Sequence, residues 1–383
     1  MSSFSKMYWR SSGVPVWGLI FLTVAAIGAL LAAENLRARD QVVVDNYATM
    51  VAAASKMREG MELLQPLRAQ IHPISPESDP QRSGIIGLTN SDITTTRGGL
   101  ESKQTSINPN WAAVGVKLLA DAGVGEGDLV AMTISSSFPG INLAMYSALE
   151  AMGADAIIVA SGSSSQYGAN VPGLTWIDME RELRNAGVLN LKSLTASIGG
   201  VEDRGADISP EGIASIERSI ERAGIPLLAP TSYEEAVAKR IAIFRENSAD
   251  RPIKAFVNVG GGATIVGPPG IDNYFSSGLI TSVSARAFAV ETVMGYFLRE
   301  NIPSIHMIGI KNMAERHGLP IAPIAEVPVG NGGIYSATSY RRGLALALAI
   351  GLFGLTWLIV RSARITSIWR RTSETAKGVR PMV

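Results

Sequence analysis

The stretch that decides the fold reads Gly127-Asp-Leu-Val-Ala-Met-Thr-Ile134, Ser135-Ser-Ser-Phe-Pro-Gly140, Ile141-Asn-Leu-Ala-Met-Tyr-Ser-Ala-Leu-Glu-Ala-Met152 and Gly153-Ala-Asp-Ala-Ile-Ile-Val-Ala160, followed by a Ser- and Gly-rich run to Asn170. A strand pattern meets a polar turn, a helical pattern follows, and a second strand pattern ends in a second polar loop. This order predicts a β-α-β unit. Both polar loops then lie at the same edge of a parallel sheet, where such folds place ligand sites.

Working outward, strand and helix patterns continue to alternate, which predicts an α/β fold with a doubly wound, mainly parallel sheet. The predicted strands are 85–88, 174–177, 191–198, 226–229, 253–259 and 305–310. The predicted helices are 111–122, one that begins at Asp178 with its carboxylate as the cap, 209–223, 232–247, 284–300 and 311–317.

Composition limits the class of protein. The chain has 383 residues, of which 46% are hydrophobic and 17% charged, and this suits one large α/β domain with extra segments. A formal net charge of +1 gives no basic excess that would favour nucleic acid. The absence of cysteine excludes disulfides, thiolate catalysis and cysteine-based metal sites.

Two uncharged apolar runs, 14–33 and 343–360, are close to the length of about 20 residues that a bilayer-spanning helix needs. The first 13 residues carry a net charge of +2 and the tail 361–383 carries +5, so both ends are predicted to be cytoplasmic. The remainder, net −6, is then extracytoplasmic, at the inner membrane of a bacterium. Arg341 and Arg342 oppose this orientation. The alternatives are a cleaved signal peptide for the first run and a buried core helix for the second.

The predicted organisation is a cytoplasmic terminus 1–13, a span 14–33, a juxtamembrane helix or stalk 34–72, a Pro-rich linker 73–83, an α/β domain 84–334, a span 343–360 and a basic tail 361–383. An apolar stripe from Val43 to Leu64 has heptad-like spacing. It fits either a helix that lies on the domain or a stalk that dimerises, so a homo-oligomer stays open. Small residues four apart in both spans fit pairing of the spans or a partner's helix.

The first polar loop offers Ser135, Ser136 and Ser137 at a strand-to-helix junction, where exposed N–H groups attract anions such as carboxylates. The alternative is ordinary turn and capping chemistry. A lipase-type nucleophile elbow needs glycines on both sides of the serine, and they are missing here.

The second polar loop offers Ser163, Ser164, Gln166, Tyr167 and Asn170 as lining for the same crevice, but the run contains no base. A third loop, Asn258 with Gly260, Gly261 and Gly262, allows close approach of a ligand or of another backbone. It matches neither a P-loop nor a dinucleotide fingerprint, and no cofactor is predicted.

A long polar segment, 89–110, contains Arg97 and Lys103 and is either a functional loop or poorly ordered. The three histidines have no metal-ligand spacing, so no metal is predicted. Binding through Asp92, Asp155 or Asp178 is the alternative.

Four motifs between the two apolar runs carry a family resemblance: Ser136-Ser-Phe-Pro-Gly-Ile-Asn142, Tyr167-Gly-Ala-Asn170, Thr175-Trp-Ile-Asp-Met-Glu180 and Asn258-Val-Gly-Gly-Gly262. Together they resemble the bacterial poly-γ-glutamate system protein family over about residues 84–265. The resemblance implies a membrane-anchored accessory of synthesis and export of this capsule-type polymer. Its implied partners are the poly-γ-glutamate ligase, the membrane subunits of the system and the polymer chain. It supplies no catalytic residues.

Three functional hypotheses remain. The first is a non-catalytic assembly or export component. The net acidic outer region argues against long-range attraction of a polyanion, and this favours a local site or a purely structural role. The second is a serine-based amide hydrolase or transferase that acts on the polymer. The third is a module that binds a small anion.

Overall fold

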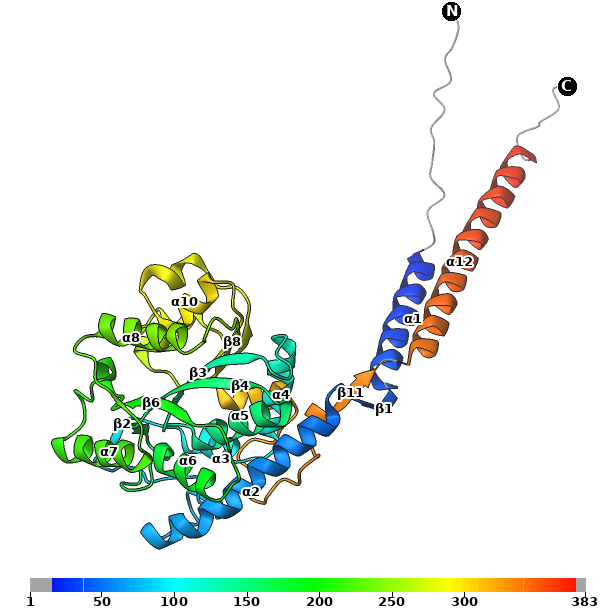
Figure 1. Ribbon diagram of the computed structural model, residues 1–383. Helices are drawn as coiled ribbons and strands as arrows, with labels where there is room; N and C mark the ends of the chain where they lie inside the picture. The colour runs from blue at the N-terminus through cyan, green and yellow to red at the C-terminus, as the bar shows by residue number, and fades with distance from the viewer. Residues whose placement is uncertain (1–15, 37, 340, 377–383) are drawn as a thin grey trace, which may run out of the picture. The chain divides into compact units, whose positions relative to one another are not determined.

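The structure is a computed structural model that describes residues 16–36, 38–339 and 341–376 (Figure 1). The described residues form two compact units. One unit spans Val43–Tyr335, and the other contains the residues up to Val42 and those from Ser336 onward. The first unit is an α/β domain with a mainly parallel sheet, and it contains the candidate site.

The sheet has seven strands in the order β7-β6-β4-β3-β8-β10-β9. The strands are β3 (Leu129–Ser135), β4 (Asp155–Ser161), β6 (Ser193–Ser197), β7 (Leu227–Leu228), β8 (Ile253–Val259), β9 (Gly278–Ile280) and β10 (Ser304–Met307). Neighbouring strands are parallel except β9, which runs antiparallel to β10. A separate short pair joins β2 (Thr94–Thr96) to β5 (Ser164–Ser165) in parallel.

Side chains alternate between the two faces of the sheet, as the pleat requires. On β3, Met132 and Ile134 enter one hydrophobic cluster, whereas Leu129 and Ala131 enter another. Both faces of the central strands are therefore buried, which explains their almost continuous apolar sequence.

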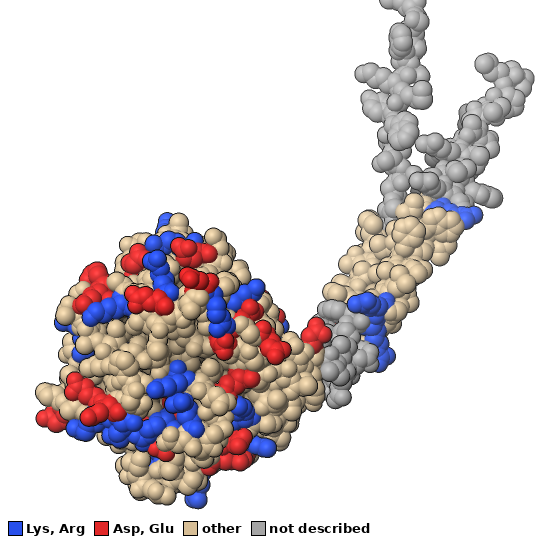
Figure 2. Space-filling model, viewed as in Figure 1, with Lys and Arg blue, Asp and Glu red and all other residues tan. Residues whose placement is uncertain are grey.

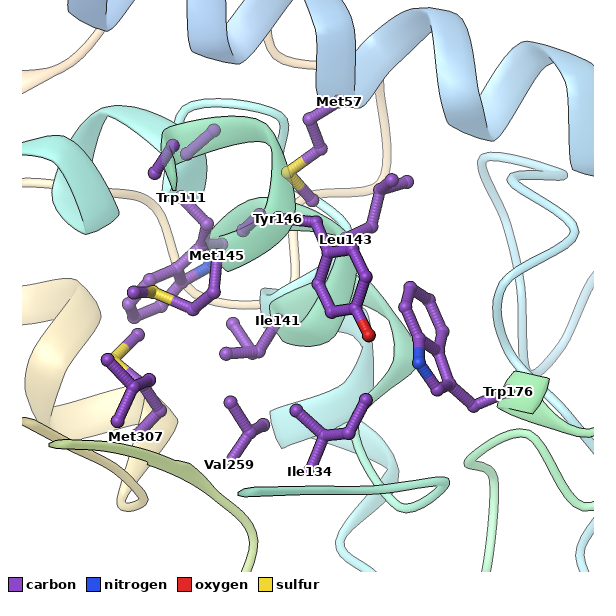
Figure 3. Close-up of a cluster of buried hydrophobic side chains, with 14 of the residues drawn as sticks. Met57, Trp111, Ile134, Ile141, Leu143, Met145, Tyr146, Trp176, Val259 and Met307 are labelled. Atoms are coloured by element: carbon purple, nitrogen blue, oxygen red, sulfur yellow. The ribbon is translucent and has the colours of Figure 1, made fainter. Parts of the chain in front are cut away.

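The helices of the α/β domain belong to these two clusters. They are α2 (Tyr47–Ile71), α3 (Leu100–Ser106), α4 (Trp111–Asp121), α5 (Pro139–Met152), α6 (Trp176–Asn185), α7 (Pro210–Ala223), α8 (Tyr233–Glu246), α9 (Ala263–Val266), α10 (Val293–Arg299) and α11 (Ile310–Arg316). In the larger cluster, Met57 of α2 lies near Tyr146 and Leu143 of α5, with Trp176 of α6 beside the tyrosine (Figure 3). The stripe from Met50 to Leu64 is buried in this domain.

The predicted β-α-β unit is confirmed as β3, α5 and β4. Pro139 occupies the first turn of α5, where its missing N–H costs nothing, and Gly153 ends the helix with φ +69°. The two polar loops therefore leave β3 and β4 at the same edge of the sheet.

Three predictions about the elements around this unit are wrong. Residues 174–177 are not a strand: α6 begins at Trp176, Thr175 is its N-cap, and Asp178 is the third helical residue in a reciprocal capping box. Residues 85–87 are buried and Leu88 is partly buried, but they do not form a strand. Residues 284–300 are split into a 3₁₀ turn, Ala285–Ala289, and the shorter helix α10.

The second unit contains α1 (Val16–Asn35), α12 (Arg342–Ala376) and a two-stranded sheet of β1 (Ala38–Val43) and β11 (Ser336–Ser339). Helices α1 and α12 contact each other and run side by side (Figure 1). Residues Val16–Asn35 and Arg342–Ala363 are long and apolar enough to cross a membrane, and Trp17 and Phe353 are about four-fifths exposed, at 80% and 77%. The predicted cytoplasmic segment 1–13 lies outside the described residues, as do residues 377–383 of the predicted tail 361–383, whereas residues 361–376 of that tail continue α12.

Candidate functional site

A cavity of about 870 Å³ lies at the carboxyl ends of β3, β4 and β8. The strand register sets its floor, because Ser135 of β3 pairs with Ser161 of β4, and Thr133 pairs with Asn258 of β8. The predicted site residues that line it are Ser135, Ser137, Ser163, Asn258, Gly260, Gly261 and Gly262. Three loops that are far apart in sequence thus meet at one place.

Gly260 allows two of these loops to approach closely. Its φ is +116°, and a Cβ atom there would lie 2.5 Å from the Ser135 hydroxyl oxygen. Any larger residue would both strain the backbone and displace Ser135. The glycine is therefore required for the shape of the cavity floor.

Ser136 and Ser164 are fully buried and connect the loops beneath the cavity. The Ser136 hydroxyl donates to the Ser161 carbonyl at 3.2 Å, and the Ser164 hydroxyl donates to the Ser136 carbonyl at 3.1 Å. These two predicted site residues position their neighbours and do not line the cavity.

Gln166, Tyr167 and Asn170 hold a different part of the chain. The Asn170 side chain accepts from the Leu88 N–H at 2.7 Å and donates to the Leu88 carbonyl at 2.8 Å, as a neighbouring strand would. The Tyr167 N–H also donates to Leu88, and the Gln166 amide oxygen accepts from the Gly98 N–H at 3.3 Å. The contacts of these three residues therefore fix residues 87–98 over the end of β4.

Asn258 belongs to a neutral polar cluster in the floor. Its side-chain oxygen accepts from the Thr133 hydroxyl at 2.8 Å, and its NH₂ group donates to the Gly260 carbonyl at 2.7 Å. The same NH₂ group lies 3.1 Å from Nδ1 of His306, and since an NH₂ group can only donate, Nδ1 is the acceptor. Burial lowers the pKa of this histidine to about 4. His306 is thus uncharged at neutral pH and stabilises the floor.

Lys103 is the main feature of the cavity that sequence reasoning did not select. Its side chain is 2% exposed, lines the cavity, and places Nζ 3.6 Å from the centre of the Phe138 ring. Nζ donates to the Ser137 carbonyl and, at 2.9 Å, to the Ser165 hydroxyl. Burial lowers the pKa of Lys103 to about 7.

No carboxylate of the described residues lies within 4.0 Å of the Lys103 ammonium. An ammonium group has three N–H donors, and two of them are used here. A buried charge is normally paired, because desolvation is costly. Lys103 therefore offers a donor and an unneutralised charge to an anion that enters the cavity.

A second buried cation, Arg240 of α8, also lines the cavity, but its charge is paired. Its guanidinium donates to Asp203 at 2.9 Å and 2.6 Å, and to the hydroxyls of Ser197 and Ser161 at 2.8 Å and 3.0 Å. Asp203 lies in the left-handed region, with φ 64°. The pair therefore holds the loop after β6 in a conformation that costs backbone strain.

The rim of the cavity carries both charge signs, with Arg97 on one segment and Glu202 and Asp207 on another. On the visible surface of the α/β domain, Lys and Arg side chains are interspersed with Asp and Glu (Figure 2). The cavity is thus distinguished by the buried cation inside it and not by a basic surface.

The fold and the cavity define the class: an α/β protein with a mainly parallel sheet, a cavity at the carboxyl ends of its strands, and two helices apolar enough to cross a membrane. Comparisons of the chain with protein-family models, with curated proteins and with solved structures find no match.

Proposed function

We propose that this protein is a membrane-anchored component of a poly-γ-glutamate synthesis and export system, and that its cavity binds carboxylate groups of the γ-glutamyl chain. The observation that carries the proposal is the buried Lys103 ammonium, which lines the cavity without a carboxylate partner in the described residues. Each unit of the polymer carries one carboxylate, which matches this donor. The four sequence motifs support the choice of polymer.

The proposed site has more than one kind of donor. Hydroxyls of Ser135, Ser137 and Ser163 and the glycine-rich backbone from Gly260 line the same cavity. Such neutral donors hold carboxylates without a strongly basic patch. The charge-assisted bond from Lys103 contributes most of the affinity in this account.

The location of the cavity also supports a binding role. We propose that the sheet is doubly wound, since each of its faces has its own hydrophobic cluster. The chain leaves β3 for β4 on one side and returns to β8 on the other, so the strand order reverses between β3 and β8. Ligands of open α/β sheets bind at such a reversal.

We further propose that α1 and α12 anchor the protein in the inner membrane, with both termini cytoplasmic and the α/β domain outside. The proposed partners are the ligase and the membrane subunits of the same system. Since the chain has no cysteine, single cysteines at Glu202 and Lys377 report orientation through a membrane-impermeant thiol reagent on intact spheroplasts. Labelling at position 202 alone is expected, and labelling at position 377 alone contradicts the orientation.

Binding is tested by calorimetric titration of the full chain in mild detergent with γ-linked glutamate oligomers. Lys103→Met is expected to weaken binding by about 10- to 100-fold, the value of one charge-assisted hydrogen bond. Lys117→Met is the matched control, because Lys117 pairs with Asp121 on the exposed side of α4. Absence of binding, or equal binding by Lys103→Met and the wild type, contradicts the proposal. Equal affinity for free glutarate identifies a small-anion site instead.

A further inference from the structure

The backbone that carries the Ser165 hydroxyl is fixed by contacts with two other segments of the chain. Ser165 pairs with Thr96 across the β2–β5 ladder, and its N–H donates to the Ser137 hydroxyl at 3.0 Å. Gly168, three residues on, lies so close to the first loop that a Cβ atom there would be 2.6 Å from the Ser137 carbonyl oxygen. A side chain held in this way has the preorganisation that a nucleophile needs.

The partner of this hydroxyl is the Lys103 amine, at 2.9 Å. Nζ is oriented by a second bond to the Ser137 carbonyl, and both side chains line the cavity. A serine, a base within hydrogen-bond reach and a group that orients the base form the arrangement used by nucleophilic enzymes. The second polar loop itself contains no base. In the folded chain the base is Lys103, which comes from α3.

We propose that Ser165 and Lys103 form a nucleophile–base pair that cleaves or transfers an amide bond of the chain bound in the cavity. The choice of a γ-glutamyl amide as substrate rests on the proposed function, whereas the pairing of the two groups does not. Protonated Lys103 binds a carboxylate of the chain, whereas uncharged Lys103 acts as the base, so the two roles belong to two protonation states.

The reaction balances with water as the second substrate. Uncharged Lys103 accepts the Ser165 hydroxyl proton while Oγ bonds to the amide carbonyl carbon. The carbon–nitrogen bond then breaks, and the leaving amine takes the proton from Lys103. Water then attacks the ester carbon while Lys103 accepts one of its protons, the bond from carbon to Oγ breaks, and Oγ takes that proton from Lys103. The product leaves as a carboxylic acid, which ionises by releasing the second water proton to the solvent. An amine of a second chain in place of water gives transfer.

The Ser137 hydroxyl is placed to assist. In the described part of the chain its hydroxyl oxygen has one hydrogen-bond partner, the Ser165 N–H, from which it accepts. Its own hydrogen is then free to donate to the carbonyl oxygen under attack, as an oxyanion donor does. Ser137→Ala is therefore expected to slow cleavage by about 100- to 1000-fold.

The first test is covalent labelling of the full chain in mild detergent with a fluorophosphonate, with the modified residue located by mass spectrometry. Modification of Ser165, lost in Ser165→Ala and reduced about 100-fold or more in Lys103→Met, is the expected result. Ser102→Ala is the matched control, since Ser102 lines the same cavity and has no hydrogen bond to Lys103 in the described structure. Modification elsewhere, or none, overturns the pair.

The second test uses the absence of cysteine in the chain. Ser165→Cys introduces a single thiol beside Lys103, and its alkylation at pH 7 is expected to be about tenfold faster than that of Ser163→Cys, since a neighbouring cation lowers a thiol pKa. Adding Lys103→Met is expected to remove the difference. Equal rates for Ser165→Cys and Ser163→Cys overturn the pair.

The third test separates the inference from the proposed function. Release of new amines from γ-linked oligomers by the wild type, with none from Ser165→Ala, supports the inference. If the oligomers bind by calorimetry but Ser165 is not labelled and no cleavage occurs, the inference is contradicted and the proposed function is not. Labelling of Ser165 without binding of the oligomers supports the pair and sinks the proposed polymer.

Discussion

Two buried cations line the same cavity and differ in what surrounds their charge. Arg240 is 1% exposed and donates to the carboxylate of Asp203. Lys103 is 2% exposed and contacts a carbonyl, a hydroxyl and an aromatic ring instead. Burial is the same, but only one charge is neutralised within the described chain.

The difference separates a structural cation from a functional one. Arg240 and Asp203 neutralise each other's charge and fix the loop after β6, so these charges are not available to a ligand. Lys103 retains the cost of desolvation, which is why its pKa falls to about 7. A group that changes charge near neutral pH inside a cavity is suited to bind an anion in one state and to accept a proton in the other.

The largest expected effect comes from breaking the neutralised pair. Asp203→Asn leaves the Arg240 charge buried without a counter-charge, which is expected to lower the free energy of unfolding by about 3–5 kcal/mol. Urea unfolding of the full chain in mild detergent, followed by tryptophan fluorescence, measures it. The double variant Asp203→Asn, Arg240→Met removes both charges and is the control, expected to recover part of the loss. A loss below about 1 kcal/mol for the single variant would mean that the pair is not desolvated.

At Lys103, removing the charge is expected to raise the free energy of unfolding instead of lowering it. Its folded pKa, about 7, lies below its unfolded value of 10.5, so the unfolded chain binds more protons between these pH values. Stability therefore rises with pH through this window, by at most about 1.4 kcal/mol per pH unit from this group. Lys103→Met is expected to be more stable than the wild type at pH 7, with a difference that shrinks by about 2–3 kcal/mol at pH 9. A difference that does not change with pH contradicts the assignment.

The neutral cluster in the floor is expected to have an intermediate effect. Asn258→Ala leaves the buried Thr133 hydroxyl and His306 Nδ1 without their partner and is expected to cost about 1–3 kcal/mol. Urea unfolding at pH 7 measures this cost. Asn247→Ala, on the exposed end of α8, serves as the control. Equal stability of the two variants would show that the cluster is not sealed from water.

The smallest effect is expected at the rim. Arg97 is exposed beside the cavity, so Arg97→Gln removes an attraction that salt screens. Affinity for γ-linked oligomers is expected to fall by about two- to fivefold at low salt, and the difference is expected to vanish at about 0.5 M salt. Calorimetry at the two salt concentrations measures it. A large loss of affinity that does not depend on salt would show that the main ligand contact is at the rim and not at Lys103.

The core of the fold could be predicted because its signals are local. Strand β3, the Pro139 helix start and the Gly153 helix end each follow from a few adjacent residues. The segment 174–177 failed because Trp176 and Ile177 are apolar and adjacent, which imitates a buried strand, whereas both are buried by the first turn of α6. The Thr175–Asp178 capping pair was a signal in the sequence that could have identified this helix start.

The location of the site could be predicted from the sequence, but not all of the residues that line it. Serines after β3 and β4 and glycines after β8 do line one cavity, because parallel strands bring their carboxyl ends together. Lys103 could not be selected, since nothing local shows that residues 87–98 are fixed over the end of β4 by Asn170 and Gln166. That contact spans about 80 residues of sequence and exists only in the folded chain.

The most direct measurement is proton uptake when a γ-linked glutamate oligomer binds the full chain at pH 8, obtained from calorimetry in buffers with different heats of ionisation. At this pH most Lys103 amines are uncharged, and a bound carboxylate raises the pKa of Lys103 again. The account predicts uptake of close to one proton per bound oligomer in the wild type and none in Lys103→Met. Tight binding with no proton uptake in the wild type would contradict the central role of Lys103.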